Sequence, residues 1–210
     1  MKIWNQSSKD KNSAIDDFLS SEDIVLDQEL FLYDIEASMA HAHELENINI
    51  LTKSETKKVI VSLKKLAKLF LAKKFKLTSK YEDCHSAIED YLTKELGSVG
   101  KKIHTGRSRN DQVMVAMRLY ARAKLDEIQS MNLKIAQSFF DKAEKHSSDP
   151  MPGYTHLQRA MPSTWGLWFG AYAESFLDNA DLLSSTQTWM NINPLGSAAG
   201  YGVNLPIKRD

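Results

Sequence analysis

The stretch from Arg107 to Asp149 contains neither glycine nor proline, and it constrains the fold more than any other part of the chain. Its apolar residues recur three or four positions apart, which predicts one long helix from about Arg109 to His146. A helix of this length cannot bury its apolar stripe against a short domain, so we expect a bundle of long helices completed by other subunits. The stripe consists of Val113, Ala116, Leu119, Tyr120, Ala123, Ile128, Met131, Ile135 and Phe139.

Shorter segments with helical periodicity lie on both sides of this helix, and no run has the pattern of a strand ladder. The predicted helices are Leu26–Asn47, Ser54 to about Lys74, the segment from Asp83 to Leu96, and Ser163–Met190. The last has an aromatic face, which we attribute to packing between helices. We therefore predict an all-α fold, with a small helical N-terminal domain over residues 1–102 and the start of a long-helix bundle over residues 103–210.

The balance of charge excludes several classes of function. The chain has 27 basic and 27 acidic residues, so a general nucleic-acid or membrane-surface binder is not expected. Its single cysteine, Cys84, excludes an intrachain disulfide framework and suits a reducing compartment. No apolar run approaches the ~20 residues that cross a bilayer, and the N-terminus lacks a signal-peptide core. We expect a soluble cytoplasmic protein.

The segment Lys101–Gln112 combines a helix start with fixed positive charge. Ser108 and Asp111 have the spacing of a capping box, in which each side chain satisfies a free backbone amide. Arg107 and Arg109 add two cations beside the partial positive charge of the helix N-terminus. This combination predicts a site for a small polyanion. The alternative is a capped helix whose arginines pair with surface acids.

Three sequence blocks, in order along the chain, resemble the signatures of the argininosuccinate lyases in the fumarase/aspartase superfamily. They are His104-Thr-Gly-Arg-Ser-Arg-Asn-Asp-Gln-Val113, Met151-Pro-Gly-Tyr-Thr-His-Leu-Gln-Arg-Ala-Met-Pro162 and Asn193-Pro-Leu-Gly-Ser-Ala-Ala-Gly200. The resemblance runs through nearly all 210 residues but covers only about the first half of such a lyase. It implies the first long helices of the superfamily's central bundle, and it requires no metal, nucleotide or redox cofactor.

Enzymes of this kind cleave argininosuccinate into arginine and fumarate. The resemblance implies that Arg109 and Asn110 bind oxygens of the succinyl carboxylates and that Thr155 donates a hydrogen bond to the substrate. It makes His156 the catalytic residue, acting in acid/base chemistry or holding a catalytic water, because histidine titrates near neutral pH. Arg107 is a further substrate-binding candidate, with a structural role as the alternative.

Residues 80–89 resemble the Asp-X-His segment of these lyases, which lies near bound substrate. Asp83 would face the arginyl end of the substrate or orient a neighbour, and His85 is a second candidate. The alternative is that Asp83 caps the helix that ends at Leu96. We interpret Cys84 as a buried packing thiol. His41 and His43 are two residues apart and do not share a helix face, so we expect no metal site there.

The chain departs from the family pattern in two places. The glycine-arginine-phenylalanine element expected near the N-terminus is replaced at residues 5–10, although either Ser20 or Ser21 falls in a segment like the family's early substrate-facing loop. The mobile loop that carries the serine base and a lysine is expected beyond residue 210, so we expect no lyase activity from this chain alone. The resemblance also implies a homotetramer in the complete protein, with each active site built where three subunits meet.

Two other functions stay open. One is a different fumarate-releasing lyase of the same superfamily, which would share the chemistry and differ in the amine. The other is a non-catalytic structural protein, because lens crystallins share this family and can retain residues such as Asn110 and His156.

Overall fold

The computed structural model describes residues 22–194, 198 and 202–208. Its elements in chain order are α2 (Asp23–Asn47), α3 (Lys53–Leu71), α4 (Cys84–Leu96), α5 (Ser98–Lys101), η1 (Lys102–His104), α6 (Arg109–Lys145), β1 (Pro150–Thr155), β2 (Gln158–Thr164) and α7 (Trp165–Met190). The contacts divide the chain into two units, the first of residues 1–120 and 193–210 and the second of residues 121–192. The predicted boundary near Lys102 stays a prediction, as do the roles of Ser20 and Ser21, which lie outside the described residues.

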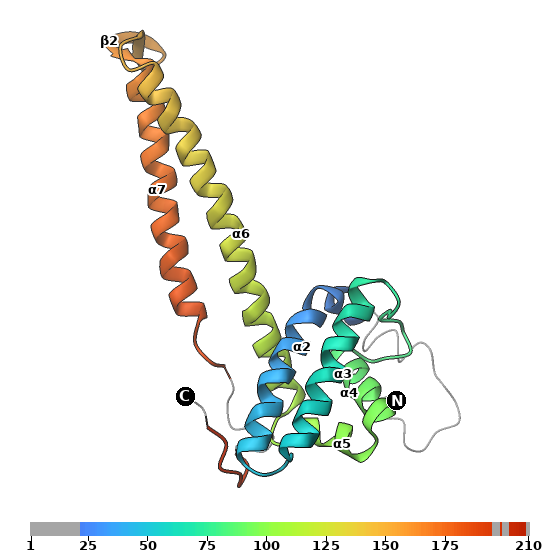
Figure 1. Cartoon of the computed structure of the whole chain (residues 1–210). Coiled ribbons are helices and arrows are strands. Elements are labelled where there is room, and N and C mark those ends of the chain that lie inside the picture. The colour runs from blue at the N-terminus through green and yellow to red at the C-terminus, as the bar shows by residue number, and fades with distance from the viewer. Residues whose placement is uncertain (1–21, 195–197, 199–201, 209–210) are drawn as a thin grey trace. The chain divides into compact units, whose positions relative to one another are not determined.

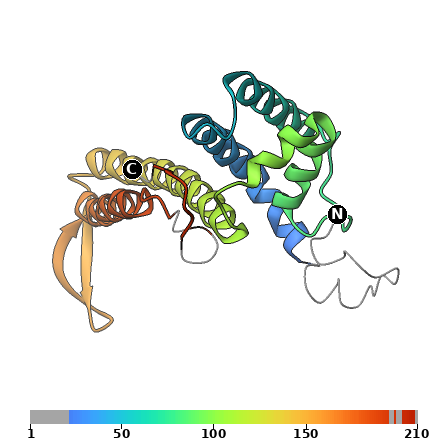
Figure 2. The same ribbon diagram turned by 90° about the horizontal axis from the view of Figure 1, so that it is seen from below.

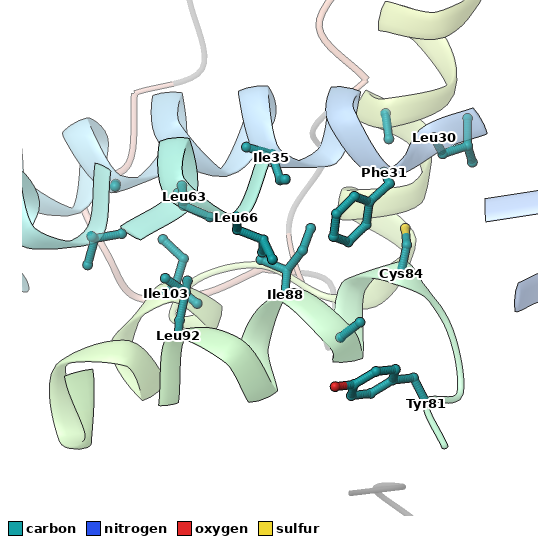
Figure 3. Packing of buried hydrophobic residues seen from close by; sticks show 14 of the residues in the cluster. Leu30, Phe31, Ile35, Leu63, Leu66, Tyr81, Cys84, Ile88, Leu92 and Ile103 are labelled. Atoms are coloured by element: carbon teal, nitrogen blue, oxygen red, sulfur yellow. The ribbon is translucent and has the colours of Figure 1, made fainter. Parts of the chain in front are cut away.

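The core of the first unit forms where α2, α3 and α4 pack together (Figure 3). Phe31 of α2 is fully buried and its ring lies 4.5 Å from that of Phe70 and 5.6 Å from that of Phe75 between centroids. Leu63 from α3 and Ile88 from α4 complete the centre of this cluster. The apolar face that predicted α3 is the one that it buries, with Val59, Leu63 and Leu66. On α2 the buried residues include Leu30, Phe31 and Ile35, whereas Leu26 is 65% exposed.

Side-chain caps set where two of these helices begin. Thr52 and Glu55 form a capping box, because the Glu55 amide donates to Thr52 Oγ1 (3.3 Å) and the Thr52 amide donates to Glu55 Oε2 (2.8 Å). The predicted start of α3 at Ser54 is therefore wrong by one residue, since the helix begins at Lys53. Asp83 caps α4 in the same way, accepting from the Ser86 amide at 2.7 Å. The capping interpretation of Asp83 is confirmed.

In the second unit α7 runs beside the part of α6 that follows Tyr120 (Figure 1). Phe139 of α6 contacts Phe169, Tyr172 and Phe176 of α7, with ring centroids 6.2, 5.3 and 5.8 Å apart. Asn132 is also buried and donates to the Phe176 carbonyl oxygen (2.6 Å). The aromatic face of α7 thus packs between helices, as predicted, and one polar contact adds a directional constraint to the pairing.

A β-hairpin joins α6 to α7 (Figure 2), so the prediction that no segment forms paired strands is wrong. Pro150 pairs with Thr164 and Thr155 with Gln158, and the register shifts at Gly153. A side chain at Gly153 would meet the Met161 carbonyl oxygen at 2.7 Å, which explains glycine at this irregularity. Proline is compatible with these strands because each strand of a two-stranded ribbon has an unpaired edge. The sequence did not indicate a hairpin here because prolines usually mark a loop.

Apart from this hairpin, the regular elements of the described residues are helices, and the predicted all-α class is confirmed. Among the residues that the structure describes, none of the helices is both long enough and apolar enough to cross a membrane. The predicted long helix is one continuous element of 37 residues.

Candidate active site

Asp83 and Arg109 are brought together in the first unit. Arg109 Nη1 forms a short ion pair with Asp83 Oδ2 and lies 3.5 Å from Glu82 Oε1. The other carboxylate oxygen of Asp83 caps α4, so one side chain both starts a helix and fixes an arginine. Arg109 Nη2 is inaccessible and has no hydrogen-bond partner among the described residues. The side chain as a whole is 23% exposed, so part of Arg109 can be reached from solvent.

The N-terminus of α6 is capped as predicted. The Ser108 amide donates to Asp111 Oδ2 (2.7 Å), and the Asp111 amide lies 3.4 Å from Ser108 Oγ. Asn110 occupies the first turn and is exposed. Arg109 and Asn110 thus stand at the end of a helix whose free amides favour negative charge.

Arg107 differs from Arg109 in its surroundings. Its side chain is 7% exposed and donates to Ser38 Oγ at 3.2 Å. Burial lowers the pKa of Arg107, although the nearby carboxylates of Asp34, Glu89 and Asp111 oppose that effect. The guanidinium stays charged because its ordinary pKa is so high. These contacts fit the structural alternative for Arg107, and its substrate role stays a prediction.

Glu89 interacts electrostatically with both Arg107 and Arg109. Its carboxylate accepts from His104 Nδ1 (2.8 Å). Burial acts to raise the pKa of Glu89, but the His104 hydrogen bond and the charges of His104, Arg107 and Arg109 hold it below its ordinary value. Glu89 is therefore ionised at neutral pH and offsets part of the arginine charge.

His85 has a buried partner that the sequence analysis missed. His85 Nδ1 donates to Asp34 Oδ2 (2.7 Å), and both side chains are fully buried. Burial acts to lower the pKa of His85, but the hydrogen bond and charge of Asp34, with Asp83 and Asp27, raise it. The available signal was an acid on the apolar face of α2, one turn before Ser38 and next to Ile35.

Cys84 is fully buried, which confirms it as a packing thiol, and burial with the nearby carboxylates of Asp34 and Asp27 raises its pKa far above the ordinary value. The Cys84 amide donates to Asp27 Oδ2 (2.8 Å). Asp34, Cys84 and His85 each place one potential metal-ligand atom within 4.8 Å of the others. Burial of the neutral thiol and the hydrogen bond within the Asp34–His85 pair account for these groups without a cation.

Thr155 and His156 belong to the second unit, at the end of the β-hairpin. Thr155 closes β1, and the two-residue turn consists of His156 and Leu157 with φ angles of 50° and 64°. Positive φ at both positions matches a type I′ turn, which is usually built from asparagine and glycine. All three residues are exposed, and Leu157 is 98% exposed. The catalytic candidate is therefore presented by a tight turn of unfavourable backbone conformation.

The predicted site residues thus fall into two groups. Asp83, Arg107, Arg109 and Asn110 are in the first unit, where Asp83 and Arg109 are in direct contact. Thr155 and His156 are in the second unit.

The chain matches the family described as lyase over residues 7–210, and it belongs to that family. It is 47% identical over 207 residues to an argininosuccinate lyase of Xanthomonas euvesicatoria, an alignment that covers 99% of this chain and 48% of the relative. The argininosuccinate lyase of Stenotrophomonas maltophilia is 46% identical over 208 residues, again 99% of this chain and 48% of the relative. The chain spans about half the length of the curated relatives it matches, and this is their N-terminal half.

Solved structures agree in fold. An EDDS lyase in complex with formate is 30% identical, with a TM-score of 0.76 over 87% of this chain and 35% of its own. A fumarate lyase described as delta crystallin from Brucella melitensis is 18% identical, with a TM-score of 0.71 over 84% of this chain and 43% of its own. The second likeness shows a shared fold only.

Proposed function

We propose that these residues form part of an argininosuccinate lyase, which eliminates fumarate from argininosuccinate and releases arginine. The observation that carries the proposal is the seat formed by Arg109 at the N-terminus of α6. Asp83 holds one side of its guanidinium, and the Arg109 side chain stays 23% exposed beside the free amides of the helix N-terminus. Such a group suits a carboxylate of the substrate.

The proposed reaction breaks a carbon–nitrogen bond after a proton leaves the neighbouring carbon. The electron pair of the broken C–H bond forms the double bond of fumarate, and that of the C–N bond goes to the guanidino nitrogen, which takes up a proton. Negative charge accumulates on the carboxylate beside the departing proton. Arg109, Asn110 and the free amides of α6 would stabilise that charge, which is worth several kcal/mol when the donors are already in place.

The remaining roles follow from the two positions at the hairpin end. His156 would move a proton in acid/base catalysis or hold a catalytic water, and Thr155 would donate a hydrogen bond to the substrate. Asp83 would orient Arg109 as well as face the arginyl end. No step in this proposal calls for a metal, nucleotide or redox cofactor.

The complete protein would need residues that this chain lacks. The base for the carbon-bound proton is a serine that the resemblance assigns outside these 210 residues, so we propose that this chain alone does not turn over substrate. We propose a cytoplasmic homotetramer for the complete protein, without nucleic-acid or membrane partners. Exposed apolar side chains on the second unit, such as Ile128, Met131, Leu177 and Leu182, support self-association. Sedimentation would test it.

The decisive experiment measures fumarate release from argininosuccinate by the purified chain alone and by the chain mixed with the C-terminal half of the Stenotrophomonas maltophilia enzyme. We expect activity only in the mixture. The mixture should lose most of that activity with His156→Gln or Asn110→Ala, whereas His43→Gln, an exposed histidine on α2, should leave it unchanged. Turnover by the chain alone would refute its proposed inactivity. A folded, associated mixture without activity would refute the lyase proposal.

A second lyase activity has a specific observation in its favour. The 30%-identical solved relative is an EDDS lyase, and a variant of that enzyme has fumarate bound. The same mixture should therefore be assayed with EDDS beside argininosuccinate. Preference for EDDS would identify EDDS, and not argininosuccinate, as the substrate. The elimination chemistry proposed above would be unchanged.

A further inference from the structure

One segment of the first unit has a large excess of positive charge, although the chain is neutral in total. Residues 53–80, which comprise α3 and the loop after it, contain ten lysines, one acidic residue and no arginine. The proposed reaction uses none of these lysines. All ten are exposed, and they are Lys53, Lys57, Lys58, Lys64, Lys65, Lys68, Lys73, Lys74, Lys76 and Lys80.

The lysines of α3 lie on the face of the helix that points away from the core. The opposite face buries Val59 and Leu63. Residues that are seven and four positions apart lie on the same side of a helix, so Lys57, Lys64 and Lys68 form a row. From the first to the last of them the row extends about 17 Å along the helix axis. The exposed face of α3 is therefore a line of positive charge.

Neighbouring acidic side chains leave most of this charge unpaired. Lys65 Nζ pairs with Glu95 Oε2 of α4 (2.9 Å), while Glu55, the one acid of the segment, pairs with Lys102 (2.8 Å). The other nine lysines form no ion pair in the described part of the chain. The adjacent helix α2 has seven acidic residues and no lysine or arginine, yet none of these acids pairs with α3 among the described residues. The lysine charge is therefore directed to solvent.

Several of the lysines occupy positions that are unfavourable for the helix itself. Lys53 and Lys57, and again Lys64 and Lys68, are four residues apart, where like charges repel each other. Lys53 is the first residue of α3, beside the partial positive charge of the helix N-terminus. Lys73 has a φ angle of 57°, in the left-handed region that favours glycine. Local stability does not account for lysine at these positions, whereas a bound polyanion would offset the repulsion.

The side chains of this surface offer charge without a geometric code. Lysine is a point charge, and the planar fork with which arginine recognises carboxylates and phosphates is absent from the segment. Phe70 and Phe75 contact Phe31 in the core, and none of the exposed residues in the segment is aromatic, so no ring is available to stack on nucleic-acid bases. A flexible chain of phosphates without bases matches such a surface.

We propose that this lysine face, the exposed lysines of residues 53–80 centred on Lys57, Lys64 and Lys68, binds inorganic polyphosphate. An extended phosphate chain neutralises successive lysines and releases the counterions that surround it in water. Affinity therefore increases with the length of the chain and falls as salt is added. None of the proposed substrate-binding residues belongs to this face, so the inference goes beyond the proposed lyase activity and stands if that activity fails.

A fluorescence anisotropy titration of labelled long-chain polyphosphate with the purified chain tests the proposal. We expect saturable binding, with a slope of about −3.5 in a plot of log affinity against log salt, the value for about five phosphates neutralised on a flexible single chain. Tripolyphosphate should compete weakly, because it reaches few of the lysines at once. Absence of polyphosphate binding at low salt would overturn the proposal.

Two other sources of phosphate are titrated in parallel, a single-stranded RNA and vesicles of phosphatidylglycerol. Each is compared with polyphosphate at the same concentration of phosphate. We expect polyphosphate to bind more tightly than either, because its charges are closest together and the surface has no exposed ring for a base. Equal or tighter binding of the RNA or of the vesicles would overturn the choice of polyphosphate.

A triple substitution on α3 locates the site. The variant with Lys57→Gln, Lys64→Gln and Lys68→Gln should bind polyphosphate at least about tenfold more weakly. Its salt slope should become shallower by about 2, because three fewer phosphates are neutralised. The three side chains are exposed, so circular dichroism should stay unchanged. Unchanged affinity in this variant would overturn the assignment to α3.

A matched control removes the same charge from the second unit. It replaces three exposed lysines of α6 with glutamine, and they are Lys134, Lys142 and Lys145. We expect this control to bind polyphosphate as the unmodified chain does. An equal loss of affinity in the two triple variants would overturn the proposal, because net charge and not the α3 face would then set the affinity.

Discussion

The two units use aromatic side chains in different ways. In the first, Phe31 is fully buried among α2, α3 and α4 and contacts Phe70 and Phe75. In the second, Phe139 packs on α7, while Phe140 is 57% exposed and Trp168 is 40% exposed. A three-helix cluster encloses its apolar side chains, whereas two helices can only cover one side of each other. The first unit therefore has a core of its own, and the second presents an apolar surface suited to a partner.

The largest expected difference is between truncations of one phenylalanine in each unit. Phe31→Ala should destabilise the first unit by about 3–5 kcal/mol, because it leaves a cavity in the core. Phe140→Ala should change the free energy of unfolding by less than about 0.5 kcal/mol, because its side chain is largely exposed. Urea unfolding followed by circular dichroism measures both. Equal losses would show that the second unit has no weaker core than the first.

The next effect concerns the buried polar pair of the first unit. Asp34→Ala leaves His85 buried without its acceptor and should cost about 3 kcal/mol. Because the pKa of His85 is raised in the folded state, the stability that its protonation contributes is complete below its unfolded pKa and is lost as pH rises through the folded value. Asp34→Ala should remove that pH dependence. Unchanged unfolding curves on both sides of neutrality would contradict the role of the pair.

The fold was largely readable from the sequence, and the site only in part. Helical periodicity and the glycine- and proline-free stretch predicted α6 because apolar faces must be buried. The hairpin was missed because Pro150, Pro152 and Pro162 mark a loop unless a strand has an unpaired edge. The contact between Asp83 and Arg109, and the acid partner of His85, depend on how distant segments pack, which no local pattern encodes.

The pH dependence of stability tests the first unit through His41, which lies on α2. His41 donates from Nε2 to the Thr105 carbonyl oxygen (2.9 Å), and burial with the Arg107 charge lowers its pKa to about 4. The unfolded chain, with a histidine pKa near 6.5, binds more protons between these values, so the first unit loses stability as pH falls from about 6.5 to 4. We expect roughly 2 kcal/mol of loss, since the side chain is partly exposed.

The His41 contribution is isolated by substitution. His41→Gln should flatten that part of the pH profile, and His43→Gln, an exposed histidine on the same helix, should leave it as it is. Thermal unfolding at pH 7 and pH 4.5 provides the measurement. A profile that His41→Gln does not alter would assign the acid sensitivity to other groups.

Matched helix caps should give a smaller effect, nearly equal in the two units. Thr52→Ala removes the side-chain acceptor of the Glu55 amide in α3, and Thr164→Ala removes that of the Leu167 amide in α7. Each should cost about 1 kcal/mol. Hydrogen exchange rates of the amides in the first turn of each helix measure the two losses separately. A loss at Thr164 several times larger than at Thr52 would show that α7 depends on its cap more than on its packing.

The smallest effect is expected at the hairpin turn. Leu157→Gly should stabilise the turn by about 0.5 kcal/mol, because glycine adopts positive φ without steric cost and the leucine side chain is 98% exposed. Exchange rates of the hairpin amides should fall slightly. Faster exchange would mean that the exposed leucine holds the turn by contacts of its own.

The double use of Asp83 limits how this position can change over generations. A residue that only caps α4 could be serine, threonine or asparagine, and one that only holds Arg109 could be glutamate. Aspartate meets both needs, since one oxygen accepts from the Ser86 amide while the other holds the guanidinium. The substitution Asp83→Asn keeps the shape and the helix start and gives up only the charge. Where only the helix start is required, asparagine would therefore serve at this position as well as aspartate.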